Sequence, residues 1–536
     1  MFSFTKRYIY LAAFLWALIF ILQREINLFG KESIDPEEYK CLLQTVQSLK
    51  REKKYLHSQL QFLKKTNNDN KTKKVEAPNN LIILANKIDT QLKEMWYYLS
   101  NRMLNLKDDP SLIKKNAKTI LEDFGELHRI TEYDFNRLVN LGRKTYKNES
   151  EKLLSSVIQE RLFRLQHPID CNNTRKFVCS LQKPCGYTCK MHFIVYCFML
   201  AYATERTFII NSSGLKYSMK NWEDFFKPTS NCTHDGGSFL WDRSHNKRKV
   251  IKLVRQVLPQ EFKIPQMPLT LPKDVYSKVI QFHKNPSVWW IGQFIKYLFK
   301  YQDHISERIK SRKEKLGFKS PIVGIHVRRT DKIKVKEAAF HNIEEYMNWV
   351  ELYYKKRMLN EVVDVKRVFI ATDDISVLSE ARRKYPEYTF LSSVEIVASA
   401  TERNEDGLHG IISDIELLSE TDYLVCTFSS GVCRMAYEMM NSKHVDASQS
   451  FHSLDDLYYF TGQSDHKMKV ILEHTPHKKE ELSLKVGDVV KVLGNHWNGQ
   501  AKVIDYKTNR EGFIPTYKLE DIYEVAEFPT YNVEMM

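Results

Sequence analysis

The chain has 536 residues, of which 43% are hydrophobic and 27% charged, and its formal net charge at pH 7 is +15. This length suffices for about two or three domains, so a chain without a substantial hydrophobic core is excluded. The positive charge does not by itself indicate nucleic acid as a partner, because much of it lies in residues 51–74, which contain eight Lys and Arg and two acidic residues. That polar, Asn-rich segment is typical of a solvated stalk.

The N-terminus predicts a membrane anchor. Lys6 and Arg7 precede the uncharged apolar run 8–22, and Gln23-Arg24-Glu25 follow it without a small-residue cleavage site. We therefore expect a cytosolic tail at 1–7, a transmembrane signal anchor at 8–22 and a luminal remainder, since basic flanks stay cytosolic. A cleaved signal peptide is the alternative.

Residues 23–165 are predicted to form a luminal, helical stem. Apolar residues recur there at alternating steps of three and four, a short coiled-coil pattern that could pair two copies of the chain; they are Leu42, Val46, Leu49, Leu56, Leu60 and Leu63. Cys41 could link such a homodimer. Further helical periodicity follows around 81–92, 113–127 and 133–165.

The cysteines favour an oxidising compartment. Six lie between residues 171 and 232, a local pair follows, and Cys41 is left over. The six and the pair are Cys171, Cys179, Cys185, Cys189, Cys197 and Cys232, and Cys426 with Cys433. Disulfides are favoured over a zinc site at Cys185 and Cys189, because no second pair with ligand spacing follows. The residues alone leave the pairing open. Sequons fit a secretory protein and occur at Asn70, Asn148, Asn172, Asn211 and Asn231.

From about residue 319, apolar strands alternate with amphipathic helices. Strands are predicted at 321–328, 367–374, from 389 and at 423–430, and helices at 343–357, 375–384, 408–419 and 432–440. This order predicts an α/β fold with a doubly wound, Rossmann-type parallel sheet, in which ligands bind beyond the carboxyl ends of the strands. The side chains at those ends are His326, Arg328, Asp373, Asp374, Ser429 and Ser430.

The stretch HVRRTDK, residues 326–332, predicts a diphosphate site. Guanidinium groups match phosphate oxygens, so Arg328, Arg329 and Lys332 can neutralise the charge. The chain contains no Asp-x-Asp pair of the kind that holds a metal in many sugar-nucleotide enzymes. We therefore expect no metal and no resident cofactor.

Residues 480–517 have short strand patterns separated by turns and predict an SH3-like barrel, placed at 466–528 with a tail at 529–536. The residues that indicate it are the segments ELS, VGD and GFIPTY with Trp497 and Gly499. The first strand region, 471–475, has no aromatic residue, so a peptide groove of the usual SH3 kind would be incomplete. His496 and the adjacent Trp497 instead offer a polar group and a planar apolar face, which suit the binding of a sugar ring.

The whole constellation resembles the α1,6-fucosyltransferases that add core fucose to N-glycans in the Golgi. The segments that carry the resemblance are HVRRTDK (326–332), EAAFHNIEEYM (337–347), ATDD (371–374), DYLVCTFSS (422–430), FHSLDDLYYF (451–460) and GNHW (494–497). It implies a GT-B-like glycosyltransferase with a catalytic domain at 166–465, of which 319–465 is the Rossmann part. It also implies a single-pass type II protein of the Golgi membrane that acts on N-glycan-bearing glycoproteins.

The resemblance implies transfer from GDP-fucose to O6 of the innermost GlcNAc, with inversion. Glu337 would be the catalytic base, Lys332 would stabilise the charge on the leaving phosphate or orient the base, and Arg328 would bind the diphosphate. The implied donor-binding residues are His326, Arg328, Arg329, Tyr217, Asp414 and Ser430, with Arg329 either holding the loop or assisting at the phosphate. The implied acceptor-binding residues are Lys183, Asp455, Asp456 and His496.

This sequence departs from the family pattern near the site. Segment 333–336 is one residue longer than in vertebrate relatives, Asn285 stands where an acceptor-binding Asp is expected, and Gly431 stands where a Gln is expected. The resemblance also implies the disulfides Cys171–Cys232, Cys179–Cys197, Cys185–Cys189 and Cys426–Cys433.

Two readings from other classes are weaker. Asp123-Phe124-Gly125 spells a kinase motif, but it lies in a helical stretch and no glycine-rich loop precedes it. The other alternative is a non-enzymatic luminal SH3 adaptor or lectin-like module, with Pro265 and Pro268 as an internal ligand of the barrel. It would not explain the diphosphate site predicted at the strand ends of the parallel sheet.

Overall fold

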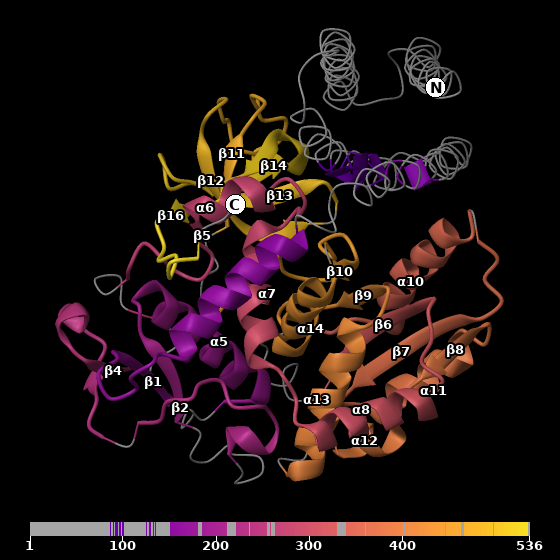
Figure 1. Ribbon diagram of the computed structural model, residues 1–536. Coiled ribbons are helices and arrows are strands. Elements are labelled where there is room, and N and C mark those ends of the chain that lie inside the picture. The colour runs from indigo at the N-terminus through magenta and orange to yellow at the C-terminus, as the bar shows by residue number, and fades with distance from the viewer. Residues whose placement is uncertain are drawn as a thin grey trace, which may run out of the picture. The chain divides into compact units, whose positions relative to one another are not determined.

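The computed structural model describes most of the chain from residue 151 onward (Figure 1). The described ranges are 151–180, 185–211, 221–234, 236–253, 258, 263–329, 339–359, 361–399, 404–444, 446–461, 466–496 and 498–533, with single residues between 86 and 135. The chain divides into two compact units, and the larger one, comprising Pro78–Arg102, Ile120–Thr475 and Leu482–Met536, contains every element described below. The predicted anchor at 8–22 and coiled coil at 42–63 lie outside the described residues. Among those described, no helix has both the length and the apolar character needed to cross a membrane.

The first sheet has four parallel strands in the order β2-β1-β4-β3. They are β1 (Lys176–Ser180), β2 (Thr207–Asn211), β3 (Phe239–Leu240) and β4 (Val250–Leu253). Strand β1 is buried along its whole length, as is usual for a central parallel strand. The sequence patterns did not predict this sheet, because its strands have five residues or fewer and lie among the cysteines.

Apolar helices pack around this sheet. Helix α5 (Tyr187–Ala203) has almost no polar face, because it lies against β1 and β2 on one side and against helices α7 (Pro286–Leu298) and α14 (Gly431–Lys443) on others. The helix at 151–166 places Leu154, Ile158, Leu162 and Leu165 in the same core, which confirms the helical periodicity predicted there. Helix α6 (Lys273–Val279) connects β5 (Leu271–Pro272) to α7.

The second sheet confirms the four predicted parallel strands, and a fifth strand at its edge, 451–453, was not predicted. Its order is β10-β9-β6-β7-β8, with β6 (Ile322–Val327), β7 (Lys366–Thr372), β8 (Tyr388–Leu391), β9 (Tyr423–Cys426) and β10 (Phe451–Ser453). Strand β9 ends at Cys426 and not at Ser430 as predicted. The chain turns there into α14, and the Ser430 amide donates to the Thr427 carbonyl at 3.0 Å.

Helices cover both faces of the second sheet (Figure 1). Helices α10 (Ile343–Arg357) and α11 (Ile375–Lys384) have the predicted bounds and pack on Val323, Ile325 and Val327. The opposite face, which includes Ile322 and Phe369, packs with α8 (Asp303–Lys315) and α13 (Glu405–Ser419). Helix α12 (Val394–Ser399) precedes α13. Helix α13 begins earlier than predicted, because the Asn404 side chain accepts from the Gly407 amide at 2.9 Å.

An antiparallel barrel follows and confirms the predicted SH3-like module. Its strand order is β14-β13-β12-β11-β15, with β11 (His466–Val470), β12 (Val489–His496), β13 (Gln500–Asp505), β14 (Glu511–Pro515) and β15 (Leu519–Asp521).

The chain after the barrel is tied to the first half of the molecule. Strand β16 (Val525–Ala526) pairs with β5, Tyr202 donates to the Pro529 carbonyl at 2.9 Å, and Arg161 donates to the Val533 carbonyl at 2.9 Å. The predicted tail is thus packed as far as residue 533.

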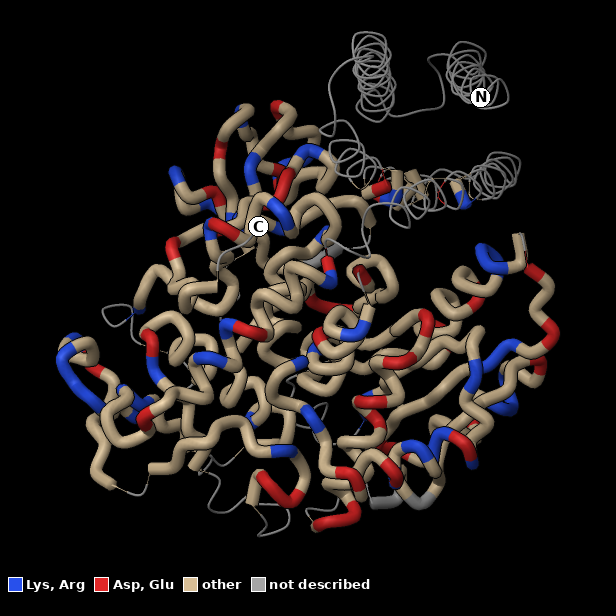
Figure 2. Tube along the Cα trace, viewed as in Figure 1, with Lys and Arg blue, Asp and Glu red and all other residues tan. Residues whose placement is uncertain are grey.

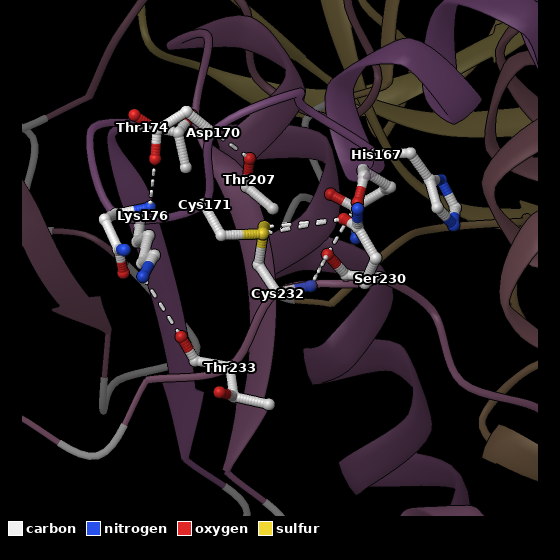
Figure 3. Close-up of a disulfide and its surroundings, with 12 residues drawn as sticks. His167, Asp170, Cys171, Thr174, Lys176, Thr207, Ser230, Cys232 and Thr233 are labelled. Carbon is white, nitrogen blue, oxygen red and sulfur yellow. Dashed lines mark hydrogen bonds between the residues drawn. A yellow bond between two sulfur atoms is a disulfide. The ribbon is translucent and has the colours of Figure 1, made fainter.

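All four implied disulfides are present: Cys171–Cys232, Cys179–Cys197, Cys185–Cys189 and Cys426–Cys433. Figure 3 shows the first of them beside β1. Around it, Lys176 Nζ donates to the Thr233 carbonyl at 3.1 Å and the Cys232 amide donates to Ser230 Oγ at 3.1 Å.

Basic and acidic residues are both scattered along the described trace (Figure 2). No strip of Lys and Arg alone runs across the described part in this view, although the chain as a whole is basic.

Candidate active site

His326 lies near the carboxyl end of β6, in the centre of the second sheet, with 5% of its surface exposed. Burial, and then the neighbouring Arg328 guanidinium, lower the pKa of His326 to about 4, with Asp373 acting in the opposite direction. Its imidazole is therefore neutral near pH 7. The buried Nδ1 has no hydrogen-bond partner in the described part of the chain, so a ligand could use it.

Arg328 follows the strand directly and is oriented by a carboxylate from the next strand. Arg328 Nε lies 3.3 Å from Asp373 Oδ2, and the Arg328 side chain is 25% exposed while that of Asp373 is 3% exposed. The other oxygen, Asp373 Oδ1, accepts from the Arg329 amide at 2.9 Å. Asp373 therefore holds both the first turn of the loop and the guanidinium that is predicted to bind the diphosphate.

Arg329 points toward helix α11. Its Nη1 lies 2.7 Å from Glu380 Oε2, and its guanidinium carbon lies 4.9 Å from the centroid of the Phe340 ring. Of the two roles predicted for Arg329, holding the loop and assisting at the phosphate, these contacts favour the first.

Asp414 and Arg312 form an almost buried ion pair between α13 and α8, with Arg312 Nη2 at 2.6 Å from Asp414 Oδ1. Burial raises the pKa of Asp414 above its usual range, although Arg312 opposes the shift. A cavity of about 790 Å³ adjoins the pair, a volume within the range of small-molecule sites. Its lining includes Arg312, Lys315, Ser392, His409 and Ser413.

The N-terminus of α14 also lies at this sheet edge. Ser430 is its N-cap residue, and the buried Ser429 Oγ has no partner in the described part of the chain. A helix N-terminus that follows a parallel strand favours an anion.

The departure at Gly431 has a steric reason. A Cβ atom added at Gly431 would lie 2.5 Å from Thr188 Oγ1 on α5, so a Gln at this position would require Thr188 to shift. The departure at Asn285 keeps a structural role, because its side chain caps α7 by accepting from the Val288 amide at 3.3 Å.

Asp455 and Asp456 follow β10 and differ in what they contact. Asp455 accepts from the Ser429 amide at 3.3 Å and from Ser453 Oγ at 3.1 Å, so this carboxylate holds the loop. Asp456 is exposed. Of the two, Asp456 is the one whose side chain can reach a sugar without breaking a described contact.

The structure thus brings together His326, Arg328, Ser430 and Asp455 at the carboxyl ends of adjacent strands. Tyr217, Lys183, Lys332 and Glu337 lie outside the described residues, and so does the side chain of His496, whose backbone ends β12. Sequence reasoning gave no role to Arg312 or Glu380. Nothing in the sequence marks either as a partner, because the carboxylate that pairs with Arg312 is 102 residues away and the guanidinium that pairs with Glu380 is 51 residues away. No group of three or more His, Cys, Asp or Glu side chains in the described part is placed to hold a metal ion.

A parallel sheet whose carboxyl edge presents an arginine, a neutral histidine and a helix N-terminus is typical of nucleotide-binding α/β enzymes. Comparison with known proteins narrows this class. A family model described as alpha-(1,6)-fucosyltransferase N- and catalytic domains matches residues 37–459, and one described as a variant SH3 domain matches residues 467–522.

Two relatives carry the same description. The alpha-(1,6)-fucosyltransferase of Drosophila melanogaster is 40% identical over 459 residues, which covers 83% of this chain and 74% of the relative. That of Caenorhabditis elegans is 34% identical over 462 residues, with 82% and 78% covered. The chain therefore belongs to the alpha-(1,6)-fucosyltransferase family, as its sequence predicts, and it is a glycosyltransferase.

Among solved structures, one titled NodZ alpha-1,6-fucosyltransferase soaked with GDP-fucose is 16% identical. It has a TM-score of 0.32 and covers 50% of this chain and 93% of that chain. At this score the superposition does not establish a common fold.

Proposed function

We propose that the enzyme transfers fucose from GDP-fucose to O6 of the innermost, Asn-linked GlcNAc of N-glycans, with inversion, to give α1,6 core fucosylation. The observation that carries the proposal is the Arg328–Asp373 pair beside neutral His326 at the end of β6, in a chain of this family. A fixed guanidinium can bind diphosphate oxygens through charge-assisted hydrogen bonds.

The proposed reaction is a single displacement. The O6 hydroxyl of GlcNAc attacks C1 of fucose while the bond from C1 to the β-phosphate oxygen breaks, and GDP leaves. The O6 proton passes to the Glu337 carboxylate, and Lys332 and Arg328 stabilise the charge that develops on GDP. GDP-fucose is the donor substrate in this scheme, and no resident cofactor is required.

The other substrate contacts are proposed on the family resemblance together with local geometry. Tyr217 and Asp414 would lie near the guanosine, and the cavity beside Asp414 and Arg312 supports that placement. His326 and Ser430 would meet the phosphates or fucose. Lys183, Asp455, Asp456 and His496 would contact the acceptor, with Asp455 acting mainly by holding its loop.

Release of GDP tests the proposal directly. The solubilised full chain should release GDP from GDP-fucose at a rate that rises on adding a biantennary N-glycan with terminal GlcNAc. A lectin-like or adaptor module would bind the glycan without releasing GDP.

Chelation should leave the activity intact. Arg328 and its neighbours supply the positive charge that faces the diphosphate, so we expect transfer in excess EDTA to stay within about twofold of the untreated rate. The measurement is GDP release before and after EDTA and after adding back Mn²⁺. Complete loss with EDTA that Mn²⁺ restores would contradict the metal-independent scheme.

The SH3-like barrel is proposed to hold the sugar acceptor and not a proline-rich peptide. The substitution His496→Ala should raise the acceptor KM or lower turnover while GDP binding and thermal stability stay unchanged, because a histidine next to a tryptophan in the sequence offers a polar group and a planar apolar ring that suit a sugar. Kinetics in both substrates measure the effect, and His466→Ala is the control, since that barrel histidine pairs with Asp521 at 2.6 Å.

A peptide of the PxxP type should not compete with the glycan. Unchanged acceptor kinetics in His496→Ala together with measurable peptide binding would instead assign the barrel a recruitment role.

The cellular context is proposed from the sequence. Residues 8–22 would anchor the chain in the Golgi membrane with the catalytic part luminal, and the stem helices at 42–63 would pair two copies. The two parallel sheets, each covered by helices, are consistent with a GT-B-like arrangement whose second half is doubly wound.

A further inference from the structure

Residues 454–460, which follow β10, form a loop that we call the acceptor loop, because it carries Asp455 and Asp456. The loop is attached to the β9–α14 segment at several points. The same segment carries Ser430, which lies at the proposed donor site. Its attachment therefore bears on how the two substrates are placed relative to each other.

The first attachment is a hydrogen bond to a completely buried carboxylate. Tyr458 Oη donates to Glu438 Oε1 at 2.8 Å, and Glu438, on α14, has none of its surface exposed. The carboxylate is held in turn by His192 of α5, whose Nε2 lies 2.9 Å from Glu438 Oε2 and which is 2% exposed. One side chain of α14 thus connects a helix of the first half to the acceptor loop.

The Tyr458 hydroxyl remains a donor under all working conditions. Burial, and then the adjacent Glu438 carboxylate, hold the pKa of Tyr458 well above its usual range. The Tyr458 hydroxyl therefore donates and the Glu438 oxygen accepts. The contact is therefore specific to a hydroxyl at position 458.

A second attachment lies one helical turn earlier on α14. The Arg434 guanidinium carbon lies 4.0 Å from the centroid of the Tyr459 ring, a cation–π distance, and Arg434 Nη1 donates to the Phe428 carbonyl. Arg434 therefore supports one face of the half-buried Tyr459 ring and fixes the turn that follows β9 at the same time.

The third attachment is Asp455 itself, which accepts from the amide of Ser429 at 3.3 Å. The three contacts come from positions 429, 434 and 438, so the acceptor loop is fixed to the residues around the N-terminal half of α14. Among the described residues of the site, only this loop is held to its neighbour by all three kinds of contact: a backbone amide, a cation–π contact and a hydroxyl–carboxylate hydrogen bond.

We propose that Glu438 and Arg434 are positioning residues, which hold the acceptor loop at a fixed place relative to the donor-binding turn at Ser429 and Ser430. The inference rests on the proposed function, since it requires that Asp456 and its neighbours meet the acceptor glycan. Neither residue touches a substrate in this account. Their effect should appear in acceptor binding, because the donor side of the turn is also held by β9 and by the hydrogen bond from the Ser430 amide to the Thr427 carbonyl.

The test is Tyr458→Phe in the solubilised full chain, with kinetics measured separately in GDP-fucose and in a biantennary agalacto N-glycan. We expect the acceptor KM to rise about three- to tenfold, because one hydrogen bond that holds the acceptor loop is lost, while the donor KM stays within about twofold. Tyr301→Phe is the matched control. It removes a buried tyrosine hydroxyl that donates to Glu416 Oε2 at 3.1 Å, away from the loop, and should change neither KM.

A second variant, Arg434→Lys, tests the loop through a different contact and should raise the acceptor KM in the same direction. If the acceptor KM is unchanged in both Tyr458→Phe and Arg434→Lys, the inference is overturned. It is also overturned if the donor and acceptor KM values rise equally and the control Tyr301→Phe shows the same rise. A wild-type chain that forms no fucosylated glycan would instead contradict the proposed function. The two failures are therefore distinguishable.

Discussion

Replacing Glu337 with Gln should reduce fucose transfer by about 100- to 10,000-fold, the usual contribution of a general base. The amide has nearly the size of the carboxylate but cannot accept the proton that leaves O6 of GlcNAc. Binding of GDP should be unchanged, since the base acts on the acceptor. The measurements are the single-turnover transfer rate and the dissociation constant for GDP.

The control for this variant is Glu351→Gln. Glu351 lies on α10 and pairs with Lys355 at 2.7 Å on an exposed face, so its removal should leave the rate within about twofold. If Glu337→Gln keeps more than about a third of the wild-type rate, less than 1 kcal/mol of barrier is involved and the base lies elsewhere.

Arg328→Ala should weaken donor binding severely. Each charge-assisted hydrogen bond contributes about 1.5 to 3 kcal/mol, so losing one or two weakens the binding of GDP by at least about tenfold. The variant also leaves Asp373, which is buried at the site, without its guanidinium partner at 3.3 Å. An uncompensated carboxylate would then repel the diphosphate, which adds to the loss.

Calorimetry with GDP measures this effect, and Arg328→Lys should restore little of it, because an ammonium group does not reproduce the fork of the guanidinium. Arg357→Ala is the control, since Arg357 pairs with Glu361 on the surface of α10. Near-normal affinity for GDP in Arg328→Ala would show that this arginine is surface charge and not a phosphate ligand.

The second sheet could be predicted closely from the sequence, and the first could not. Amphipathic helices of ten residues or more, such as Ile343–Arg357 and Ile375–Lys384, carry a clear period, and their bounds were predicted to the residue. Strands β1 and β2 have five residues each, and the helix between them, α5, is buried on nearly all sides and so has no amphipathic period. Short apolar runs of this kind do not distinguish strand from helix.

The site shows a similar division. His326 and Arg328 could be predicted as ligand-facing, because they end an apolar strand in a parallel sheet. The contacts that hold the site could not be predicted. Asp373 reaches Arg328 only through the pairing of β6 with β7, and Glu438 reaches Tyr458 only through the packing of α14. The disulfide pairing followed from family resemblance, and the residues alone would not have determined it. The predicted domain boundaries remain predictions.

The central claim is that this chain places fucose on the core of an N-glycan, and locating the transferred sugar tests it most directly. The solubilised full chain is incubated with GDP-fucose and a biantennary agalacto N-glycan, and the product is fragmented in a mass spectrometer and its linkage determined. We expect a single deoxyhexose in α-linkage to O6 of the innermost GlcNAc. A deoxyhexose found on an antennal GlcNAc, or unmodified glycan beside intact GDP-fucose, would contradict the account.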